Sequence, residues 1–383
     1  MDLLETITST GLSPLIKWPG GKEKELGVIF AYAPRAFTNY YEPFVGGGAV
    51  FTAFPAKRHL INDKSKELVE FYRCIARKDE SFYTWLEAIM SSWEAMLDFV
   101  NNHKELCQLY VAYRNDCLSD RQLKQALIDF TIQHKVVLNK IIAESIYWHR
   151  DLYLKEVLKN LERKVLRMKK IELERHIMPD CDVFANIETA FMSALYMYFR
   201  GLYNNKLIMS TDSTLATAFF VFIRNYAYSG MFRYNAKGEF NVPYGGIAYN
   251  HKNMRKKVSY YQSRALGQHL SDTNICNLDF GSFLEKFPPQ EDDFMFLDPP
   301  YDSEFSTYAQ NEFSKEDQKR LANYLINQCK SKWMLIIKNT PFILSLYQKE
   351  NLVIKSFDKK YSVSFMNRND KSAEHLLVMN YKL

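Results

Sequence analysis

The middle of the chain holds a long stretch without helix-breaking residues, since neither glycine nor proline occurs between residues 56 and 178. A stretch of this kind permits long helices. Its apolar residues recur at three- and four-residue steps, which marks one face of an amphipathic helix, as in Trp85, Ile89, Trp93, Met96 and Val100. Similar patterns predict helices over about 104–114, 119–146 and 150–175, and another between residues 178 and 200.

One of these helices, 150–175, is strongly basic along part of its length. Its lysines and arginines are interleaved with four glutamates, Glu156, Glu162, Glu172 and Glu174. The favoured interpretation is a solvated helix with ion pairs on its surface. The alternative is a helix that follows the phosphates of a nucleic acid and binds with salt-dependent affinity, and the sequence leaves it open.

Strands and helices alternate on both sides of the helical stretch. Strands are predicted at 39–41, 60–63, 275–278, 294–297, 333–337, 352–357 and 375–380, and a helix capped by Ser314 at 314–329. This alternation predicts an α/β fold with a mostly parallel sheet and helices on both faces. The sheet domain is then discontinuous and consists of residues 1–78 and 255–383, with residues 79–254 inserted between its halves.

The motif Asp298-Pro299-Pro300-Tyr301 follows the predicted strand at 294–297. Two prolines end the strand and fix the backbone, so that a carboxylate, a backbone carbonyl and an aromatic ring lie at one edge of the sheet. The carboxylate and the carbonyl can accept hydrogen bonds from an NH₂ group, and the ring can stack on a heterocycle. The motif therefore suits a planar amine, although the same residues also occur as a simple strand terminator.

Three glycines, Gly46 to Gly48, separate the strand at 39–41 from a helix that begins at Ala49. Glycine permits positive φ and close approach of a ligand, and the first strand-to-helix turn of doubly wound folds binds nucleotide-like cofactors. Asp63 ends the next strand 17 residues after Gly46, a spacing that suits a carboxylate bound to ribose hydroxyls. The alternative is a flexible loop with a chance acid downstream.

A third motif lies at residues 17–22, with the sequence KWPGGK. Together and in this order, the three motifs resemble the Dam-like DNA adenine-N6 methyltransferases (the alpha or D12 class). In that family the cofactor motifs precede the target-recognition region and the DPPY motif follows it. Residues 232–245 resemble the DNA-reading hairpin of the family. The resemblance covers about residues 14–78 and 222–383, and it does not explain residues 79–221.

The resemblance implies a Rossmann-like methyltransferase sheet that uses S-adenosylmethionine, and an inserted, mainly helical target-recognition domain with a β-hairpin at 230–246. It assigns cofactor binding to Trp18, Lys22, Phe44, Gly46, Gly48, Asp63, Asp279 and Phe280. It assigns catalysis to Asp298, Pro299, Pro300 and Tyr301, where Asp298 and the Pro299 carbonyl hold the amino group and Tyr301 stacks on the extruded base. It assigns DNA contacts to Arg233, Tyr234, Asn235, Lys237 and Asn241. For Asp279 the cofactor role and a simple loop cap are both open.

The composition adds weaker constraints. A formal charge of +6 and a pI of about 8.7 are compatible with a polyanionic partner. The six cysteines form no CxxC pair, so we expect reduced intracellular thiols, and no cysteine or histidine spacing implies a metal. No signal-peptide pattern occurs and no apolar stretch reaches about 18 residues, so we expect a cytoplasmic protein without a membrane partner.

The sequence therefore predicts a site-specific methyltransferase that moves a methyl group from S-adenosylmethionine to the exocyclic amino group of a flipped adenine in double-stranded DNA. The alternatives are methylation of cytosine or of RNA, a catalytically silent DNA-binding protein, and a generic nucleotide-binding protein. A GATC-like target is a hypothesis from the hairpin alone. A companion restriction endonuclease, a phage or regulatory role and the oligomeric state are left open.

Overall fold

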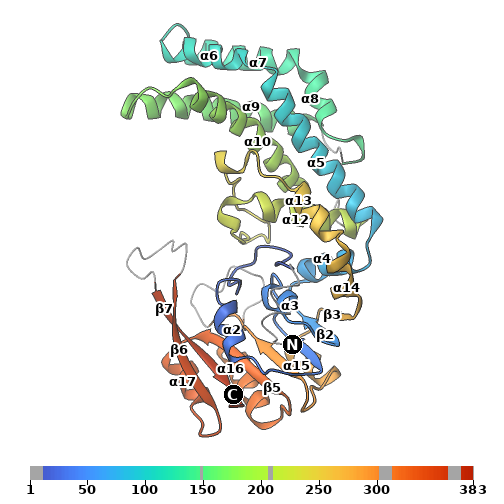
Figure 1. Cartoon of the computed structure of the whole chain (residues 1–383). Coiled ribbons are helices and arrows are strands. Elements are labelled where there is room, and N and C mark those ends of the chain that lie inside the picture. Colours follow the sequence, from blue (N-terminus) through green and yellow to red (C-terminus); the bar gives the residue numbers. More distant parts are fainter. Residues whose placement is uncertain (1–11, 147–149, 206–209, 302–312, 361–371, 383) are drawn as a thin grey trace. The chain divides into compact units, whose positions relative to one another are not determined.

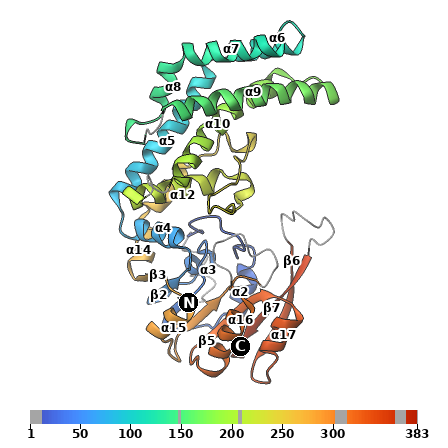
Figure 2. The same cartoon turned by 180° about the vertical axis from the view of Figure 1, so that it is seen from behind.

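The computed structural model describes residues 12–146, 150–205, 210–301, 313–360 and 372–382. The chain divides into two compact units, drawn from opposite sides in Figures 1 and 2. The first unit is discontinuous and contains Met1–Lys78 and Tyr261–Leu383, and the second unit is Asp79–Tyr260. Within the described ranges, no helix is both long and apolar enough to cross a membrane.

The first unit is built on one sheet, in which the described residues form seven strands in the order β3-β2-β1-β4-β5-β7-β6. The strands from β3 to β5 are parallel, β7 is antiparallel to β5, and β6 is antiparallel to β7. Their bounds are β1 (Asn39–Glu42), β2 (Arg58–Asn62), β3 (Thr273–Cys276), β4 (Phe294–Leu297), β5 (Lys332–Lys338), β6 (Val353–Lys360) and β7 (Ser372–Met379). The predicted α/β class and mostly parallel sheet are confirmed, with each strand within a few residues of its predicted range.

The strand order reverses between β1 and β4. Strands β2 and β3 lie on one side of β1, and strands β4 and β5, which follow them in the sequence, lie on the other side. In open α/β sheets, ligands bind beyond the carboxyl ends of the strands at such a reversal. The glycine loop follows β1 and the Asp298 motif follows β4, so this topology brings both motifs to the same edge of the sheet.

Helices cover both faces of the sheet. Neighbouring residues of each strand point to opposite faces, and apolar side chains on each face pack against helices. Tyr41 belongs to a core cluster that includes Phe283 of α15, Leu321 of α16 and Ile343 of α17. On the opposite face, Tyr40 stacks on Phe54 with ring centroids 5.5 Å apart, and Phe30 of α2 lies 4.9 Å from the same ring. The helices are α2 (Leu26–Tyr32), α3 (Ala49–Ala53), α4 (Lys66–Ala76), α14 (Arg264–Ser271), α15 (Phe280–Lys286), α16 (Lys315–Asn327) and α17 (Pro341–Tyr347).

Ser314 caps α16 as the sequence predicted. Its hydroxyl accepts a hydrogen bond from the Asp317 amide at 3.2 Å, and the Asp317 carboxylate accepts from the Ser314 amide at 3.0 Å. This reciprocal capping box satisfies two amides at the start of the helix.

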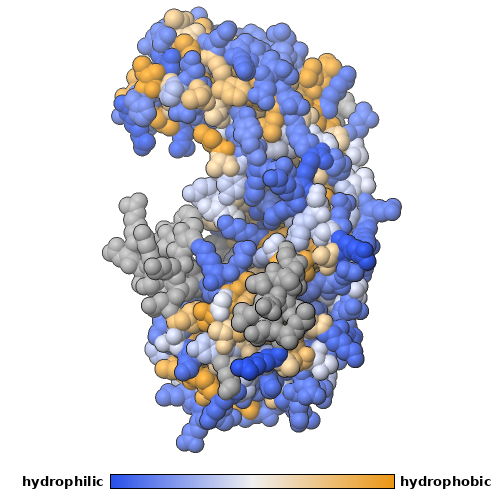
Figure 3. Space-filling view, viewed as in Figure 1, coloured by the Kyte–Doolittle hydropathy of each residue, from blue (hydrophilic) through white to orange (hydrophobic). Residues whose placement is uncertain are grey.

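The second unit is mainly helical in the described residues, and its two longest helices, α9 and α10, pack on one another. Figure 3 shows that hydrophobic and hydrophilic side chains are mixed on the surface of this unit. Its elements are α5 (Glu80–Asn101), α6 (Glu105–Arg114), α7 (Asp120–Gln133), α8 (Lys135–Ile141), η1 (Glu144–Ile146), α9 (Arg150–Glu174), α10 (Asp180–Asn204), α12 (Ser213–Tyr226), η2 (Tyr228–Gly230), η3 (Ile247–Tyr249) and α13 (Arg255–Tyr261).

The single helix predicted at 119–146 is wrong in one respect, because the chain forms α7, α8 and η1 there. The first break lies at His134, whose backbone has φ −96° and ψ 7°. At this bend the His134 ring packs 4.5 Å from the Phe130 ring. Tertiary packing selects the bend, and no glycine or proline marks it in the sequence.

The basic helix α9 carries ion pairs on its surface. Lys159 pairs with Glu156 at 3.3 Å, and Lys124 of α7 pairs with Glu162 at 3.3 Å. These contacts support the solvated-helix interpretation, and the phosphate-following alternative stays a prediction.

The second unit also contains an antiparallel ribbon, residues 226–245, in the region predicted as a hairpin. Two isolated bridges join it, one between Ala227 and Tyr244 and one between Tyr234 and Phe240. No regular strand forms in the ribbon, which differs from the prediction. The chain pairs antiparallel as expected, but the ladder is interrupted between the bridges.

Helix side chains supply hydrogen bonds that a strand ladder would otherwise make. The Asn204 amide donates to the Phe240 carbonyl at 3.0 Å, and its oxygen accepts from the Phe240 amide at 2.8 Å. Arg200 donates to the Val242 carbonyl at 3.0 Å. Phe240, Val242 and Tyr244 are buried in alternation with more exposed neighbours, so the predicted period of two is retained.

Candidate active site

The Asp298 motif begins directly after β4 and contacts the motif at residues 17–22. The Asp298 carboxylate forms an ion pair with the Lys22 ammonium, and the two side chains are 18% and 2% exposed. Lys22 also donates to the Tyr301 hydroxyl at 3.1 Å and to the Gly20 carbonyl at 2.9 Å. The Tyr301 hydroxyl donates to Asp298 Oδ1 at 3.4 Å. Two sequence motifs far apart in the chain are thus joined around one carboxylate.

A second carboxyl group, that of Glu42, is buried at the end of β1. The Tyr40 hydroxyl donates to Glu42 Oε2 at 2.7 Å. Burial raises the pKa of Glu42 well above its usual range, the Tyr40 bond opposes this shift, and the nearby Asp298 charge adds to it. Glu42 is therefore a second titratable carboxyl group close to the Lys22–Asp298 ion pair. The sequence did not mark Glu42 as a site residue, although it lies four residues before Gly46.

The glycine loop is tied to Asp63 at the end of β2. The Gly46 amide donates to Asp63 Oδ2 at 3.0 Å, and the Ser65 amide donates to Oδ1 at 2.9 Å. Burial raises the pKa of Asp63, and these two amide bonds oppose the shift. The Tyr72 hydroxyl of α4 donates to the Gly46 carbonyl at 3.0 Å, a contact that no sequence signal could have revealed.

The glycines are also required by packing within the chain. A Cβ on Gly47 would lie 2.3 Å from the Ile16 carbonyl oxygen, and one on Gly48 would lie 2.4 Å from the Tyr72 hydroxyl. Gly48 has φ +80°. A Cβ on Gly46 would meet the Trp18 ring at 2.9 Å, so Trp18 lies against the loop. Close packing of the protein's own atoms, backbone at Gly47 and side chains at Gly46 and Gly48, accounts for these residues before any ligand is considered.

Phe44 and Phe280 lie close together beside the loop. Their ring centroids are 5.7 Å apart, and Arg320 of α16 lies 4.4 Å above the Phe280 ring. Arg320 also donates to Asp279 at 2.8 Å. Asp279 caps α15 by accepting from the Gly281 amide at 2.9 Å. Burial alone would raise its pKa, but the bonds from Arg320 and Gly281 outweigh burial and lower it.

The prolines of the motif differ in their surroundings, since Pro299 is buried and Pro300 is exposed. The Pro300 carbonyl accepts a hydrogen bond from Gln318 Nε2 at 2.9 Å, and Gln318 is completely buried in α16. Gln318 is a second residue that the sequence did not identify. It ties the backbone after β4 to the next helix.

The five residues predicted to contact DNA all lie in the ribbon. Arg233 Nε donates to Asn241 Oδ1 at 2.9 Å across the two arms. Tyr234 and Tyr203 hydroxyls lie 3.3 Å apart. Asn235 Oδ1 accepts from the Lys237 amide at 2.9 Å, so the Asn235 side chain shapes the turn.

A sequence model of the D12 class of N6 adenine-specific DNA methyltransferases matches this chain over residues 18–153 and 153–363. The chain belongs to this class. The match also runs through residues 79–221, which the motif resemblance did not explain. The predicted family and reaction are confirmed, and this D12-class enzyme is an N6 adenine-specific DNA methyltransferase.

Individual relatives of this D12-class enzyme have low sequence identity to it, but the alignments cover most of this chain. The type II methyltransferase M.CviBI of Paramecium bursaria Chlorella virus NC1A is 24% identical over 376 residues, which is 97% of this chain and 100% of the relative. The DNA adenine methylase of Vibrio cholerae is 25% identical over 365 residues, 92% of this chain and 91% of the relative. The DNA N-6-adenine-methyltransferase of Escherichia phage P1 is 23% identical over 91% of this chain and 33% of the relative.

Proposed function

We propose that the first unit binds S-adenosylmethionine beyond the carboxyl ends of β1, β2 and β3, and holds the amino group of an adenine at Asp298 after β4. The observation that carries the proposal is the ion pair between Asp298 and the buried Lys22, because it joins the amine-binding motif to a motif beside the glycine loop. When bound, the cofactor supplies an electrophilic methyl group on a sulfonium.

The residues at this edge suit such a cofactor. Asp63 is partly exposed at the end of β2, where its carboxylate can accept from ribose hydroxyls while it retains the Gly46 amide. The partly exposed Phe44 ring, which packs on the buried Phe280 ring, offers an apolar surface for an adenine ring. In this proposal the cofactor lies among Trp18, Lys22, Phe44, Gly46, Gly48, Asp63, Asp279 and Phe280.

Asp298 and the Pro299 carbonyl would act on the target amine. The adenine amino nitrogen is a poor nucleophile because its lone pair is delocalised into the ring. Two acceptors that bind both of its N–H bonds favour a tetrahedral nitrogen and aim the lone pair at the methyl group. Lys22 gives Asp298 a charge partner, so that the carboxylate does not lie unpaired beside Glu42. Positioning of this kind supplies a large share of a rate enhancement.

Tyr301 would stack on the extruded base. Flipping a base costs a few kcal/mol, and stacking on an aromatic ring returns about 1–3 kcal/mol. The Tyr301 hydroxyl is held by Lys22 and Asp298, which limits the motion of the ring. Pro300 would set the backbone between the acceptor and the ring.

We also propose that the second unit recognises the target site through the ribbon. Arg233 and Lys237 are exposed there and can donate to phosphates or bases, and Tyr234 and Asn241 lie beside Arg233 on the same ribbon. Asn235 would act by fixing the turn that presents Lys237. Because M.CviBI is named a type II methyltransferase, a companion restriction endonuclease is a partner to test.

Long-read sequencing of DNA from a methylation-deficient bacterium that expresses this chain tests the proposal. The expected result is 6-methyladenine at one recurring motif, with loss of the mark in Asp298→Ala and retention of S-adenosylmethionine binding by calorimetry. Asp63→Ala should instead weaken cofactor binding. More than a few per cent of activity in Asp298→Ala would overturn its role. Unmodified DNA from the well-expressed wild-type chain would favour a catalytically silent DNA-binding protein.

A further inference from the structure

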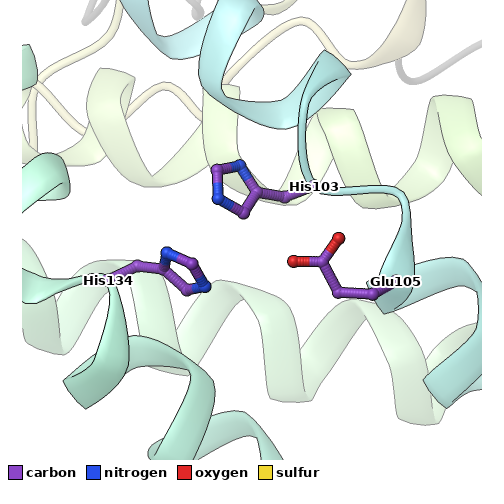
Figure 4. Close-up of side chains that lie close together, drawn as sticks. All are labelled: His103, Glu105 and His134. Carbon is purple, nitrogen blue, oxygen red and sulfur yellow. The ribbon is translucent and has the colours of Figure 1, made fainter.

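Two histidines and a glutamate meet in the second unit, and none of them belongs to the sequence motifs that resemble the family. His103 follows α5, Glu105 is the first residue of α6, and His134 lies at the bend between α7 and α8. One ligand atom of each residue lies within 4.8 Å of those of the other two. Figure 4 shows the three side chains projecting from different elements into one shared space.

The His103 ring is held in a tautomer that suits a metal ligand. Its Nδ1 lies 2.6 Å from the Phe99 carbonyl oxygen. A carbonyl oxygen can only accept, so Nδ1 carries the proton and Nε2 of the neutral ring keeps its lone pair. Histidines that bind metals commonly donate their second ring nitrogen to a backbone carbonyl in this way.

Packing fixes both imidazole rings. The His103 ring stacks on Phe99 with centroids 4.1 Å apart, and the His134 ring packs on Phe130 at 4.5 Å. The two imidazoles themselves lie 4.3 Å apart, edge to face. Two of the three ligands are therefore oriented by the fold. Glu105 is exposed and can move.

We propose that His103, Glu105 and His134 bind a transition-metal dication, with Zn²⁺ as the best-suited ion. Imidazole nitrogens and a carboxylate are ordinary zinc ligands, and a tetrahedral ion with bonds of about 2.0–2.2 Å places its ligands roughly 3.3–3.6 Å apart. The three ligand atoms lie within 4.8 Å of one another, so the two rings and the Glu105 side chain must close by up to about 1.5 Å to reach these separations. Two nitrogen ligands disfavour Mg²⁺ and Ca²⁺, which prefer oxygen.

The bound ion would link two helix junctions, one between α5 and α6 and one between α7 and α8. Three ligands leave a fourth position for water, and Glu105 is open to solvent. The ion therefore exchanges with solvent and is removed by a chelator, unlike an ion in a closed four-ligand site. Its role is to stabilise this end of the second unit.

Calorimetric titration of the chelator-treated full chain with Zn²⁺ alone tests the site. We expect one ion per chain and a rise in the unfolding midpoint that grows with the logarithm of free Zn²⁺. Co²⁺ at the same site should give the visible absorption of a tetrahedral ion. His134→Gln and Glu105→Gln should each weaken Zn²⁺ binding by about tenfold or more.

Two matched controls separate the site from general surface binding. His176→Gln changes an exposed histidine in the same unit, and Glu80→Gln changes the exposed first residue of α5 as Glu105→Gln does in α6. Both controls should bind Zn²⁺ like the wild type. The proposal is overturned if the wild type binds no Zn²⁺, or if Glu105→Gln folds normally and binds as tightly as Glu80→Gln.

Discussion

The two regions that carry the family motifs are held in place by different means. In the first unit, the glycine loop and the Asp298 motif follow neighbouring parallel strands, so the strand ladder fixes where each begins. In the second unit, the ribbon has only isolated bridges, and Asn204 and Arg200 supply hydrogen bonds to its backbone. The first region is therefore destabilised by added side-chain atoms, and the second by the loss of side-chain hydrogen bonds.

The largest expected effect comes from adding one methyl group to the glycine loop. Gly47→Ala would place Cβ 2.3 Å from the Ile16 carbonyl oxygen, so backbone must move. We expect a loss of about 2–3 kcal/mol in the free energy of unfolding, together with weaker S-adenosylmethionine binding. Denaturant unfolding and calorimetry measure the two quantities.

Gly27→Ala is the matched control, because nothing lies within 4 Å of a Cβ at this position in α2. Alanine is a better helix former than glycine, so this variant should be unchanged or slightly more stable. Equal losses in the free energy of unfolding in both variants would show that steric contact of a Cβ does not restrict position 47.

A smaller effect is expected from removing the amide that holds the ribbon. Asn204→Ala leaves the buried Phe240 amide and carbonyl without their side-chain partner. Unsatisfied buried groups cost about 1–3 kcal/mol, and we expect about 2 kcal/mol here with faster hydrogen exchange at the Phe240 amide. Asn101→Ala, at the exposed end of α5, is the control. Unchanged exchange at Phe240 would show that the side chain does not hold the ribbon.

The sequence predicted regular elements better than side-chain partners. Phe294–Leu297 is completely buried on both faces, and its continuous apolar run predicted β4 without error. The bend at His134 was missed because apolar spacing continues across it. Glu42 and Gln318 were missed because their roles depend on residues brought near only by the fold. Apolar periodicity indicates which face of a helix or strand is buried, but it does not indicate which residues of other elements pack against that face.

A third effect, of about 1–2 kcal/mol near pH 5, is expected in the first unit. His59 and His269 have ring centroids 4.3 Å apart, and each places Nε2 near a backbone carbonyl. Burial lowers the pKa of both, that of His269 to about 4. The unfolded chain, with a histidine pKa of 6.5, binds protons more readily than the folded protein does. Stability that is present above pH 6.5 is therefore lost as the pH falls toward 4.

Unfolding measured between pH 7 and pH 4.5 tests this prediction. His269→Gln retains a donor for the Phe51 carbonyl but cannot be protonated, so its stability should change less with pH over this window. The same pH slope in the variant and the wild type would show that other groups cause the acid sensitivity.

The smallest expected effect concerns the exposed tip of the ribbon. Lys237→Ala should reduce DNA affinity by about 1 kcal/mol with little change in stability. If Lys237 contacts a base, the variant should discriminate less well at one base pair. If it contacts a phosphate, binding should weaken for all sequences, and the slope of log affinity against log salt concentration should fall by about one. Lys140→Ala, which changes an exposed lysine of α8, is the control. Equal affinity and specificity in both variants would remove Lys237 from the interface.

The central position of β1 in the sheet has a consequence during synthesis on the ribosome. β1 pairs with β2 on one side and with β4 on the other, and Asn62 and Phe294 are 232 positions apart (294 − 62). At about 5–20 residues per second, translation covers this distance in roughly 10–50 s. For that time the growing chain carries β1 with one edge unpaired, while the whole second unit is completed. Open strand edges promote association between chains, so we expect the nascent enzyme to be most prone to association before β4 emerges.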